Sequence, residues 1–212
     1  MRIKFLILLS LVWISGAYAL SGFLVSDQGE LEGTGFWVDG TGINDWTPAR
    51  IDWEVTDNGN STWHYEYTLS VYGADVSHFI LETSETFTES NIFNLSAPGT
   101  GVELGTFVPD SGNPSMPGSV YGIKFDSTSG TEVTISFDSD RDPVWGDFYA
   151  KCGNTGGTQN TVWNEGFLTT DPISAATDGT LSNHILVPDT VPEPATLALL
   201  GLGGMLIRRR RK

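Results

Sequence analysis

Residues 61–71 read Ser-Thr-Trp-His-Tyr-Glu-Tyr-Thr-Leu-Ser-Val, a regular alternation of large apolar and polar side chains. The apolar set is Trp63, Tyr65, Tyr67, Leu69 and Val71, and the polar set is His64, Glu66, Thr68 and Ser70. Because successive side chains of a β-strand point to opposite faces, this period of two predicts a strand with one buried face. The run Asp57-Asn58-Gly59-Asn60 just before it is typical of a tight turn.

Two further stretches, 119–126 and 131–139, alternate in the same way. Between them, residues 126–130 read Asp-Ser-Thr-Ser-Gly, which predicts a hairpin turn. Shorter apolar runs predict the remaining strands, at 22–26, 35–38, 50–55, 78–82, 104–108, 144–150, 162–168 and 184–187. Many short strands separated by turns, without a long amphipathic helix between the two ends, predict an all-β fold, an antiparallel β-sandwich or jelly roll.

The N-terminus has the three parts of a secretory signal. Arg2 and Lys4 precede an apolar run at 5–14, and Ala17 and Ala19 place small residues where a signal peptidase reads the chain. We therefore expect residues 1–19 to be a signal peptide with a membrane-inserting helix, cut after Ala19.

The C-terminus combines a short apolar segment with a basic cluster. Residues 195–207 carry no charge, and the chain then ends in Arg208, Arg209, Arg210, Arg211 and Lys212. Thirteen helical residues span only about 20 Å, less than the roughly 30 Å hydrocarbon core of a bilayer. Five consecutive cationic side chains stay on the cytoplasmic side and can snorkel, so we expect a short transmembrane helix with its basic end inside.

The order of Val191, Pro192, Glu193 and Pro194, then an apolar segment, then arginines resembles the PEP-CTERM sorting signal. The same segment is also labelled the ice-binding protein C-terminal domain, but this sequence lacks the regular threonine array of ice-binding β-proteins. The resemblance implies recognition of residues 191–194 by exosortase, a membrane processing enzyme of Gram-negative bacteria that often make exopolysaccharide. It also implies that the helix holds the precursor in the bilayer and that the basic cluster orients it. The alternative is a tail anchor that stays uncut, with the same topology.

Three segments follow from these boundaries: a signal peptide at 1–19, a β-sandwich ectodomain at 20–190 and a sorting tail at 191–212. All 26 acidic residues lie between Asp27 and Glu193, where only four basic residues occur, which leaves this stretch a net charge of −22. Such a domain repels nucleic acid and anionic lipid surfaces. We expect no nucleic-acid partner, whereas cations, neutral glycans and basic proteins stay open.

Alternating carboxylates at Asp138, Asp140 and Asp142 are the candidate metal ligands, since calcium binds six to eight oxygens. As an EF-hand loop the segment fails, because the sixth position is Pro143 and the twelfth is Tyr149. The favoured interpretation is a solvated strand end. A calcium site would need Asp126 or Asp147 brought close by the fold, so no cofactor is expected, with calcium left open.

Six tryptophans lie between the signal peptide and the tail: Trp37, Trp46, Trp53, Trp63, Trp145 and Trp163. Exposed aromatic rings can stack on sugars, but in a β-sandwich of this size we expect most of them to fill the core. Trp46 is the one expected in a loop.

Catalytic signatures are missing from this sequence: it contains no G-x-S-x-G, H-E-x-x-H, Walker or dinucleotide-binding motif. His64, His78 and His184 are scattered, which favours structural or surface roles. Cys152 has no second cysteine to pair with and is expected to be a buried, inert residue.

The leading expectation is a non-enzymatic protein, exported by way of an inner-membrane-anchored precursor to the cell surface or extracellular matrix. Its expected partners are signal peptidase, an exosortase-like enzyme, the membrane and extracellular polysaccharide. A carbohydrate-binding module, with or without calcium, is the alternative, and a glycan-active hydrolase is a less favoured one.

Overall fold

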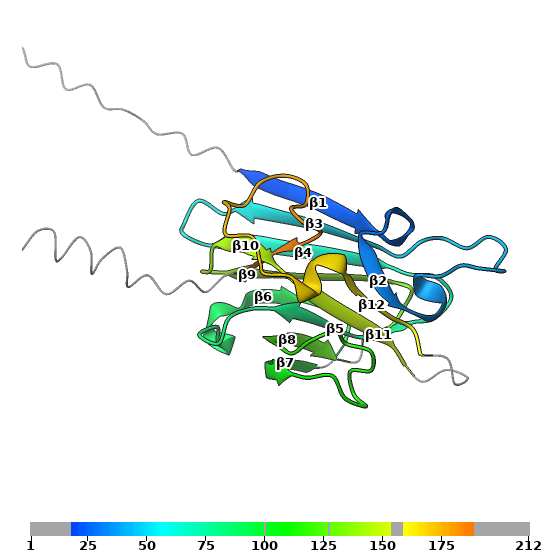
Figure 1. The fold of residues 1–212 in the computed structure, drawn as a ribbon. Helices are drawn as coiled ribbons and strands as arrows, with labels where there is room; N and C mark the ends of the chain where they lie inside the picture. Colours follow the sequence, from blue (N-terminus) through cyan, green and yellow to red (C-terminus); the bar gives the residue numbers. More distant parts are fainter. Residues whose placement is uncertain (1–17, 100, 127, 154–158, 189–212) are drawn as a thin grey trace, which may run out of the picture.

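The computed structural model describes residues 18–99, 101–126, 128–153 and 159–188, and these form two facing β-sheets with a small third sheet (Figure 1). The expected signal peptide at 1–19 lies outside the described residues as far as residue 17, whereas its last residue, Ala19, begins the first strand of the sandwich. The expected transmembrane helix at 195–207 also lies outside the described residues. No helix in the described part of the chain has the length and apolarity needed to cross a membrane. The all-β, antiparallel prediction is confirmed for the region between the two ends.

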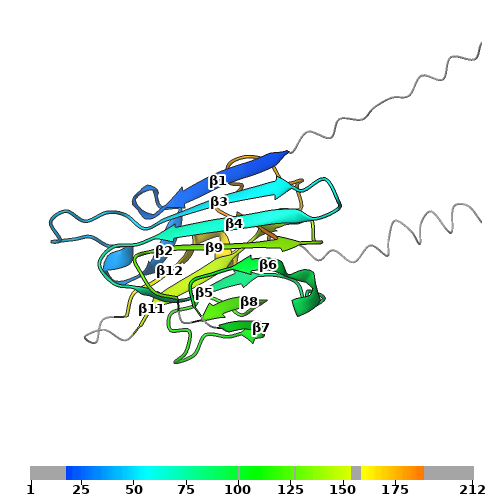
Figure 2. The same cartoon turned by 180° about the vertical axis from the view of Figure 1, so that it is seen from behind.

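One sheet has five strands, all antiparallel to their neighbours (Figure 2). In spatial order they are β1 (Ala19–Val25), β3 (Arg50–Asp57), β4 (Trp63–Ser70), β9 (Glu132–Ser139) and β6 (Phe93–Ser96). The stretch at 61–71 thus supplies the central strand, β4, and its predicted apolar face is buried: Tyr65, Tyr67 and Leu69 are at most 1% exposed.

The facing sheet has six strands, also antiparallel. In spatial order they are β2 (Leu31–Thr34), β12 (Thr161–Asn164), β11 (Phe148–Cys152), β5 (Val76–Glu82), β8 (Val120–Asp126) and β7 (Gly101–Phe107). Four short 3₁₀ turns interrupt the connections: η1 (Ser26–Gln28), η2 (Gly35–Trp37), η3 (Glu89–Asn91) and η4 (Glu165–Leu168).

A two-stranded sheet of β10 (Pro143–Gly146) and β13 (Ile185–Pro188) bridges the two large ones, because β13 contacts both β3 and β5. The buried hydroxyl of Tyr67 on β4 donates to the carbonyl oxygen of Leu186 on β13 at 2.9 Å. β1 begins and β13 ends at the same end of the sandwich (Figures 1 and 2). The register agrees, since Ala19 pairs with Thr56, beside the turn into β4, and Pro188 pairs with Pro143, just after β9.

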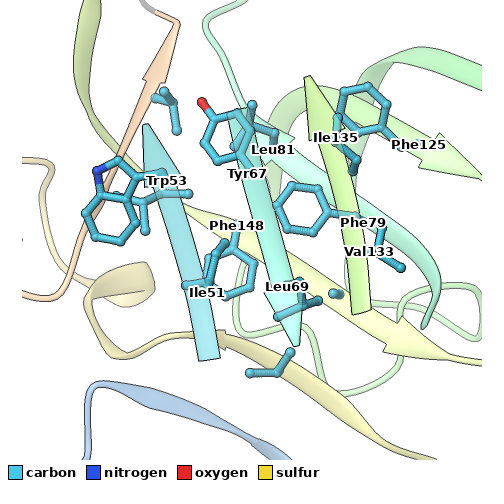
Figure 3. Close-up of a cluster of buried hydrophobic side chains, with 14 of the residues drawn as sticks. Ile51, Trp53, Tyr67, Leu69, Phe79, Leu81, Phe125, Val133, Ile135 and Phe148 are labelled. Atoms are coloured by element: carbon cyan, nitrogen blue, oxygen red, sulfur yellow. The ribbon is translucent and has the colours of Figure 1, made fainter. Parts of the chain in front are cut away.

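Aromatic rings from both sheets fill the main core (Figure 3). Phe79 on β5 stacks on Phe148 of β11 with ring centroids 5.5 Å apart, and Tyr67 of the opposite sheet lies 6.2 Å from Phe79. Contacts at these separations stabilise a core beyond simple area burial, by about 0.5–1.5 kcal/mol a pair. The Cys152 side chain is also buried, as expected, and its Sγ accepts a hydrogen bond from the backbone N–H of Asn160.

The hairpin predicted at 126–130 is wrong, because β8 and β9 belong to opposite sheets. β8 pairs with β5 and β7, whereas β9 pairs with β4 and β6. The connection crosses between the sheets, and the buried Thr128 hydroxyl donates to the carbonyl oxygen of Val76. The residues typical of a turn therefore mark a change of direction without showing which strand pairs with which.

Three other strand predictions need correction. Residues 35–38 lie in η2 and the turn after it, and the strand of this region is β2, just before it. The run 144–150 divides at Asp147 into β10 and β11, and the run 162–168 divides into β12 and η4. The exposed edge strand β6 has no sequence signal, because all four of its side chains face solvent.

A second, smaller core lies on the outer face of the six-stranded sheet. Its buried members are Ile80, Phe107, Met116, Val120, Tyr149, Trp163 and Phe167. The loop after β7 is held against it, since the Tyr149 hydroxyl donates to the carbonyl oxygen of Pro114 at 2.6 Å.

Candidate functional site

Asp138 on β9 is engaged by its neighbours in the five-stranded sheet. Its Oδ1 lies 2.7 Å from Nδ1 of His64, and its Oδ2 accepts from the Asn94 side chain at 2.6 Å. Partial burial acts to raise the pKa of Asp138, but these hydrogen bonds outweigh it and hold that pKa below its ordinary value.

Asp140 and Asp142 face other partners. Asp140 accepts from the Asn91 side chain at 2.8 Å, and Asp142 accepts from the indole N–H of Trp63 at 2.9 Å. The fold does not bring Asp126 or Asp147 to this group, since Asp126 pairs with Lys124 at 3.0 Å and Asp147 joins a different cluster. Calcium binding at the 138–142 segment stays a prediction.

The six tryptophans lie in or against the core or in half-buried positions, and none is among the exposed large apolar side chains of the described residues. Trp37, Trp53 and Trp145 are at most 2% exposed. Trp46 lies in a loop, as expected, but its indole N–H donates to the carbonyl oxygen of Phe36 at 2.6 Å. A flat platform of exposed tryptophans is therefore not how the described part of this chain would bind a sugar.

The outer face of the five-stranded sheet contains a hollow of about 600 Å³ over β1, β3 and β4. Its charged lining is wholly acidic: Glu30, Asp52, Glu54 and Glu66. Phe23 contributes an exposed ring at the same place, and the Arg50 guanidinium lies over that ring, 3.9 Å from its centroid.

A buried cluster of acids and one histidine lies between β5, β10, β11 and β13. Asp147 joins β10 to β11, Asp171 follows η4, and His184 immediately precedes β13. Glu82, the last residue of β5, adjoins them, because its Oε2 accepts from the backbone N–H of Asp147 at 2.9 Å. Three distant parts of the chain therefore converge on Asp147.

The ligand atoms of Asp147, Asp171 and His184 all lie within 4.8 Å of one another. Nε2 of His184 is 3.6 Å from Oδ1 of Asp147 and 3.4 Å from Oδ1 of Asp171. The imidazole is 0% exposed and Asp147 is 4% exposed, while the Asp171 side chain is 45% exposed. In the described part of the chain, this is the only such group of three or more metal-ligand side chains.

Neighbouring groups fix the orientation of Asp147 and His184. Oδ1 of Asp147 accepts from the Asn164 side chain at 2.6 Å, and Nδ1 of His184 lies 3.2 Å from the carbonyl oxygen of Leu181. The ring also needs Gly166, because a Cβ there would lie 2.7 Å from the His184 ring. Nδ1 must be the donor to a carbonyl oxygen, so the proton of a neutral ring lies on Nδ1.

The turn that leads into His184 uses left-handed backbone at two successive residues. Ser182 has a φ of 52° and Asn183 a φ of 56°. Asparagine tolerates this region better than most residues, and the Asn183 side chain donates to Glu165 at 2.9 Å. This turn places His184 at the start of β13.

Burial disfavours the charged forms of the carboxyls in this cluster. It raises the pKa of Glu82, and the nearby Asp147 and Asp171 carboxylates add to that rise. Burial raises the pKa of Asp147 as well, against the hydrogen bond from Asn164, and it raises the pKa of Asp171. In the described part of the chain, His184 is the only basic side chain that lies within ion-pair distance of Asp147 or Asp171.

In the sequence, Asp147 stands out only as an accessory to the 138–142 segment, and no pattern connects it with Glu82, Asp171 or His184. Taken in chain order, the four residues are separated by successive gaps of 65, 24 and 13 positions, so no local spacing could indicate them. The available signal was the break in the 144–150 run, where an aspartate interrupts an otherwise apolar stretch.

The described residues define an antiparallel β-sandwich domain with a buried acid–histidine cluster near its last strand. Residues 190–212, directly after that strand, match the PEP-CTERM protein-sorting motif. The resemblance noted from residues 191–212 is therefore confirmed, and it implies an exported protein that an exosortase-type system sorts. No curated protein and no solved structure matches this chain.

Proposed function

We propose that this chain is a non-enzymatic protein of the cell surface or extracellular matrix of a Gram-negative bacterium. The observation that carries the proposal is the sorting motif at residues 190–212, which follows the β-sandwich without an intervening domain. A β-sandwich with a strongly acidic composition is suited to a protein that is displayed among polysaccharides and cations. The charge of −22 between the two ends supports this placement.

The proposed route has two membrane steps. The signal peptide at 1–19 exports the chain, and the apolar segment at 195–207 then holds the precursor in the inner membrane with its basic end in the cytoplasm. Exosortase recognises residues 191–194 and releases the sandwich toward the surface.

Replacing Pro192, Glu193 and Pro194 with alanines tests this route. We expect the full-length variant to keep its tail and stay in the membrane fraction, while the wild-type chain loses mass and leaves that fraction. Mass spectrometry of fractionated cells measures both quantities.

A strain without its exosortase gene provides the matched control, because there the wild-type chain should behave like the alanine variant. If the two chains have equal mass and location in the exosortase-bearing strain, the sorting proposal is wrong.

The acidic hollow on the five-stranded sheet favours a second candidate, a carbohydrate-binding module for neutral glycans. Carboxylates can accept hydrogen bonds from sugar hydroxyls, and the ring of Phe23 offers an apolar face beside them.

A glycan array with the signal-cleaved chain, with and without calcium, tests the second candidate. We expect binding by the wild type and a loss of about fivefold or more in Phe23→Ala, since stacking on an aromatic ring contributes on the order of 1 kcal/mol or more. Phe93→Ala is the matched control, because Phe93 is similarly exposed but lies on β6, at the opposite edge of the sheet. Absence of binding by the wild type in both conditions excludes this candidate.

A further inference from the structure

We propose that Asp147, Asp171 and His184 bind a divalent first-row transition metal ion, for which Zn²⁺ is the test ion. The proposal is independent of the sorting route and rests on one unusual atom. Nε2 of His184 is fully buried and has no hydrogen-bond partner among the described residues, yet it points at two carboxylate oxygens. Buried polar atoms are almost always paired, so this one calls for a partner.

The tautomer leaves that nitrogen ready to act as a ligand. With its proton on Nδ1, toward the Leu181 carbonyl, a neutral His184 ring has a lone pair on Nε2. In that tautomer the ring places no proton between Nε2 and the carboxyl oxygens of Asp147 and Asp171. A histidine fixed by a backbone carbonyl through its other nitrogen is the usual arrangement of a metal ligand.

Two of the three donor separations match a tetrahedral ion. Donor atoms that each lie about 2.0–2.2 Å from a tetrahedral metal are separated from one another by about 3.3–3.6 Å. The Nε2 of His184 lies 3.4 Å and 3.6 Å from the two aspartate oxygens. The third separation, between the aspartate oxygens themselves, is within 4.8 Å.

The donor set selects the class of metal. Calcium prefers six to eight oxygens, whereas one imidazole with carboxylates suits Zn²⁺ and its first-row neighbours. A small pocket of about 110 Å³, lined by Glu82 and Asp171, adjoins the cluster. Its lining includes neither Asp147 nor His184, so it meets the proposed site at Asp171, where a water molecule or the Glu82 carboxylate would be available as a fourth ligand.

Charge supports the same assignment. Three carboxyl groups, those of Glu82, Asp147 and Asp171, meet at a largely buried position that has a single histidine as its basic partner in the described part of the chain. Burying like charges together is costly, so such carboxyls either stay protonated or are compensated by a cation. A divalent ion would supply that compensation.

The ion would fasten the last strand to the sandwich. Asp147 belongs to the junction of β10 and β11, Asp171 to the loop after η4, and His184 to the start of β13. β13 directly precedes the sorting motif, so the proposed ion would be a structural metal that stabilises the last strand before the tail. Because it would bind only the folded arrangement, it should raise stability.

The experiment uses the full chain, purified in detergent and stripped of metal by a chelator. Calorimetric titration and elemental analysis measure Zn²⁺ affinity and stoichiometry, with Mn²⁺ and Ca²⁺ as further arms. The variants are Asp171→Asn and His184→Gln, and Asp75→Asn is the matched control, which removes the same charge from an exposed side chain.

We expect one Zn²⁺ per wild-type chain and per Asp75→Asn chain, with weaker binding of Ca²⁺. Affinity should fall at least tenfold in Asp171→Asn, because even loss of a group that only orients a ligand costs 10–100-fold. Zn²⁺ should also raise the unfolding temperature of the wild type and of Asp75→Asn, but raise that of Asp171→Asn less.

The Asp171→Asn variant keeps the proposal falsifiable if His184→Gln fails to fold, since the Asp171 side chain is 45% exposed. Equal Zn²⁺ affinity in wild type and Asp171→Asn overturns the proposal. Absence of Zn²⁺ binding, or tighter binding of Ca²⁺ than of Zn²⁺, also overturns it.

Discussion

His78 on β5 is a buried histidine on the side of the sandwich that carries the smaller core, and its ring lies 6.1 Å from that of Tyr149. Burial lowers the pKa of His78 to about 4, and the positive charges of Lys124 and Lys151 act in the same direction. Asp126 and Asn113 oppose the shift without cancelling it. The folded chain therefore holds this ring in its neutral form at neutral pH.

This depressed pKa predicts a loss of stability in mild acid. An unfolded chain takes up a proton on His78 near pH 6.5, whereas the folded chain does so only near pH 4, so the free energy of unfolding falls as the pH is lowered through that window. The contribution of His78 should be about 2–3 kcal/mol by pH 4. Urea unfolding of wild type and His78→Gln at pH 7 and pH 4.5 measures it.

His64→Gln is the control for the loss of a histidine elsewhere, on the exposed face of β4. In His78→Gln the free energy of unfolding should fall less between pH 7 and pH 4.5 than it does in the wild type. In His64→Gln it should keep the fall that is due to His78. Equal pH dependence in wild type and His78→Gln would show that His78 does not contribute.

Strands β3 and β4 place two glutamates directly opposite each other, Glu54 and Glu66, on the exposed face of the five-stranded sheet. Like charges at such cross-strand positions destabilise the pair. We expect Glu66→Gln to raise the free energy of unfolding by about 0.2–1 kcal/mol in low salt. The gain should shrink in 0.5 M salt, because screening weakens the repulsion that the substitution removes.

Denaturant unfolding of both chains at two salt concentrations checks this. Glu132→Gln is the matched control, because Glu132 on β9 is also exposed but lies opposite Ser70. A gain in Glu132→Gln equal to that in Glu66→Gln would attribute the effect to net charge and not to the pair.

Among the secondary-structure elements, strands are predicted best from the sequence where one face is buried and the other is exposed to solvent. The alternation at 63–70 is a physical consequence of such a position, and β4 appears there. The same reasoning could not find β6, whose side chains are all exposed, nor the pairing of β8, because partners are set by packing of distant segments.

The acid–histidine cluster was unpredictable for a related reason. Asp147 and His184 become neighbours only through the pairing of β10 with β13, which no local pattern encodes. The sorting tail is the opposite case, since its parts are consecutive in the chain and residues 190–212 could be assigned from sequence alone.

The whole molecule carries its excess acid between two chemically different ends. Every acidic residue lies from Asp27 to Glu193, while the basic residues concentrate at the termini. Self-repulsion of this kind favours solubility and discourages self-association. It also explains why cations, and not anionic polymers, are the natural partners to test.

The common position of the two strand ends has a mechanical consequence. β1 begins and β13 ends at one end of the sandwich, so the chain enters and leaves its folded part at that same end. If both termini of the precursor are held by the same bilayer, as proposed, both leave the sandwich from one end. Neither the first nor the last strand would then have to cross the domain to reach the membrane. On the proposed route, the fold would therefore not dictate the order of the two cuts, since each would fall beside a strand end at that same end of the sandwich.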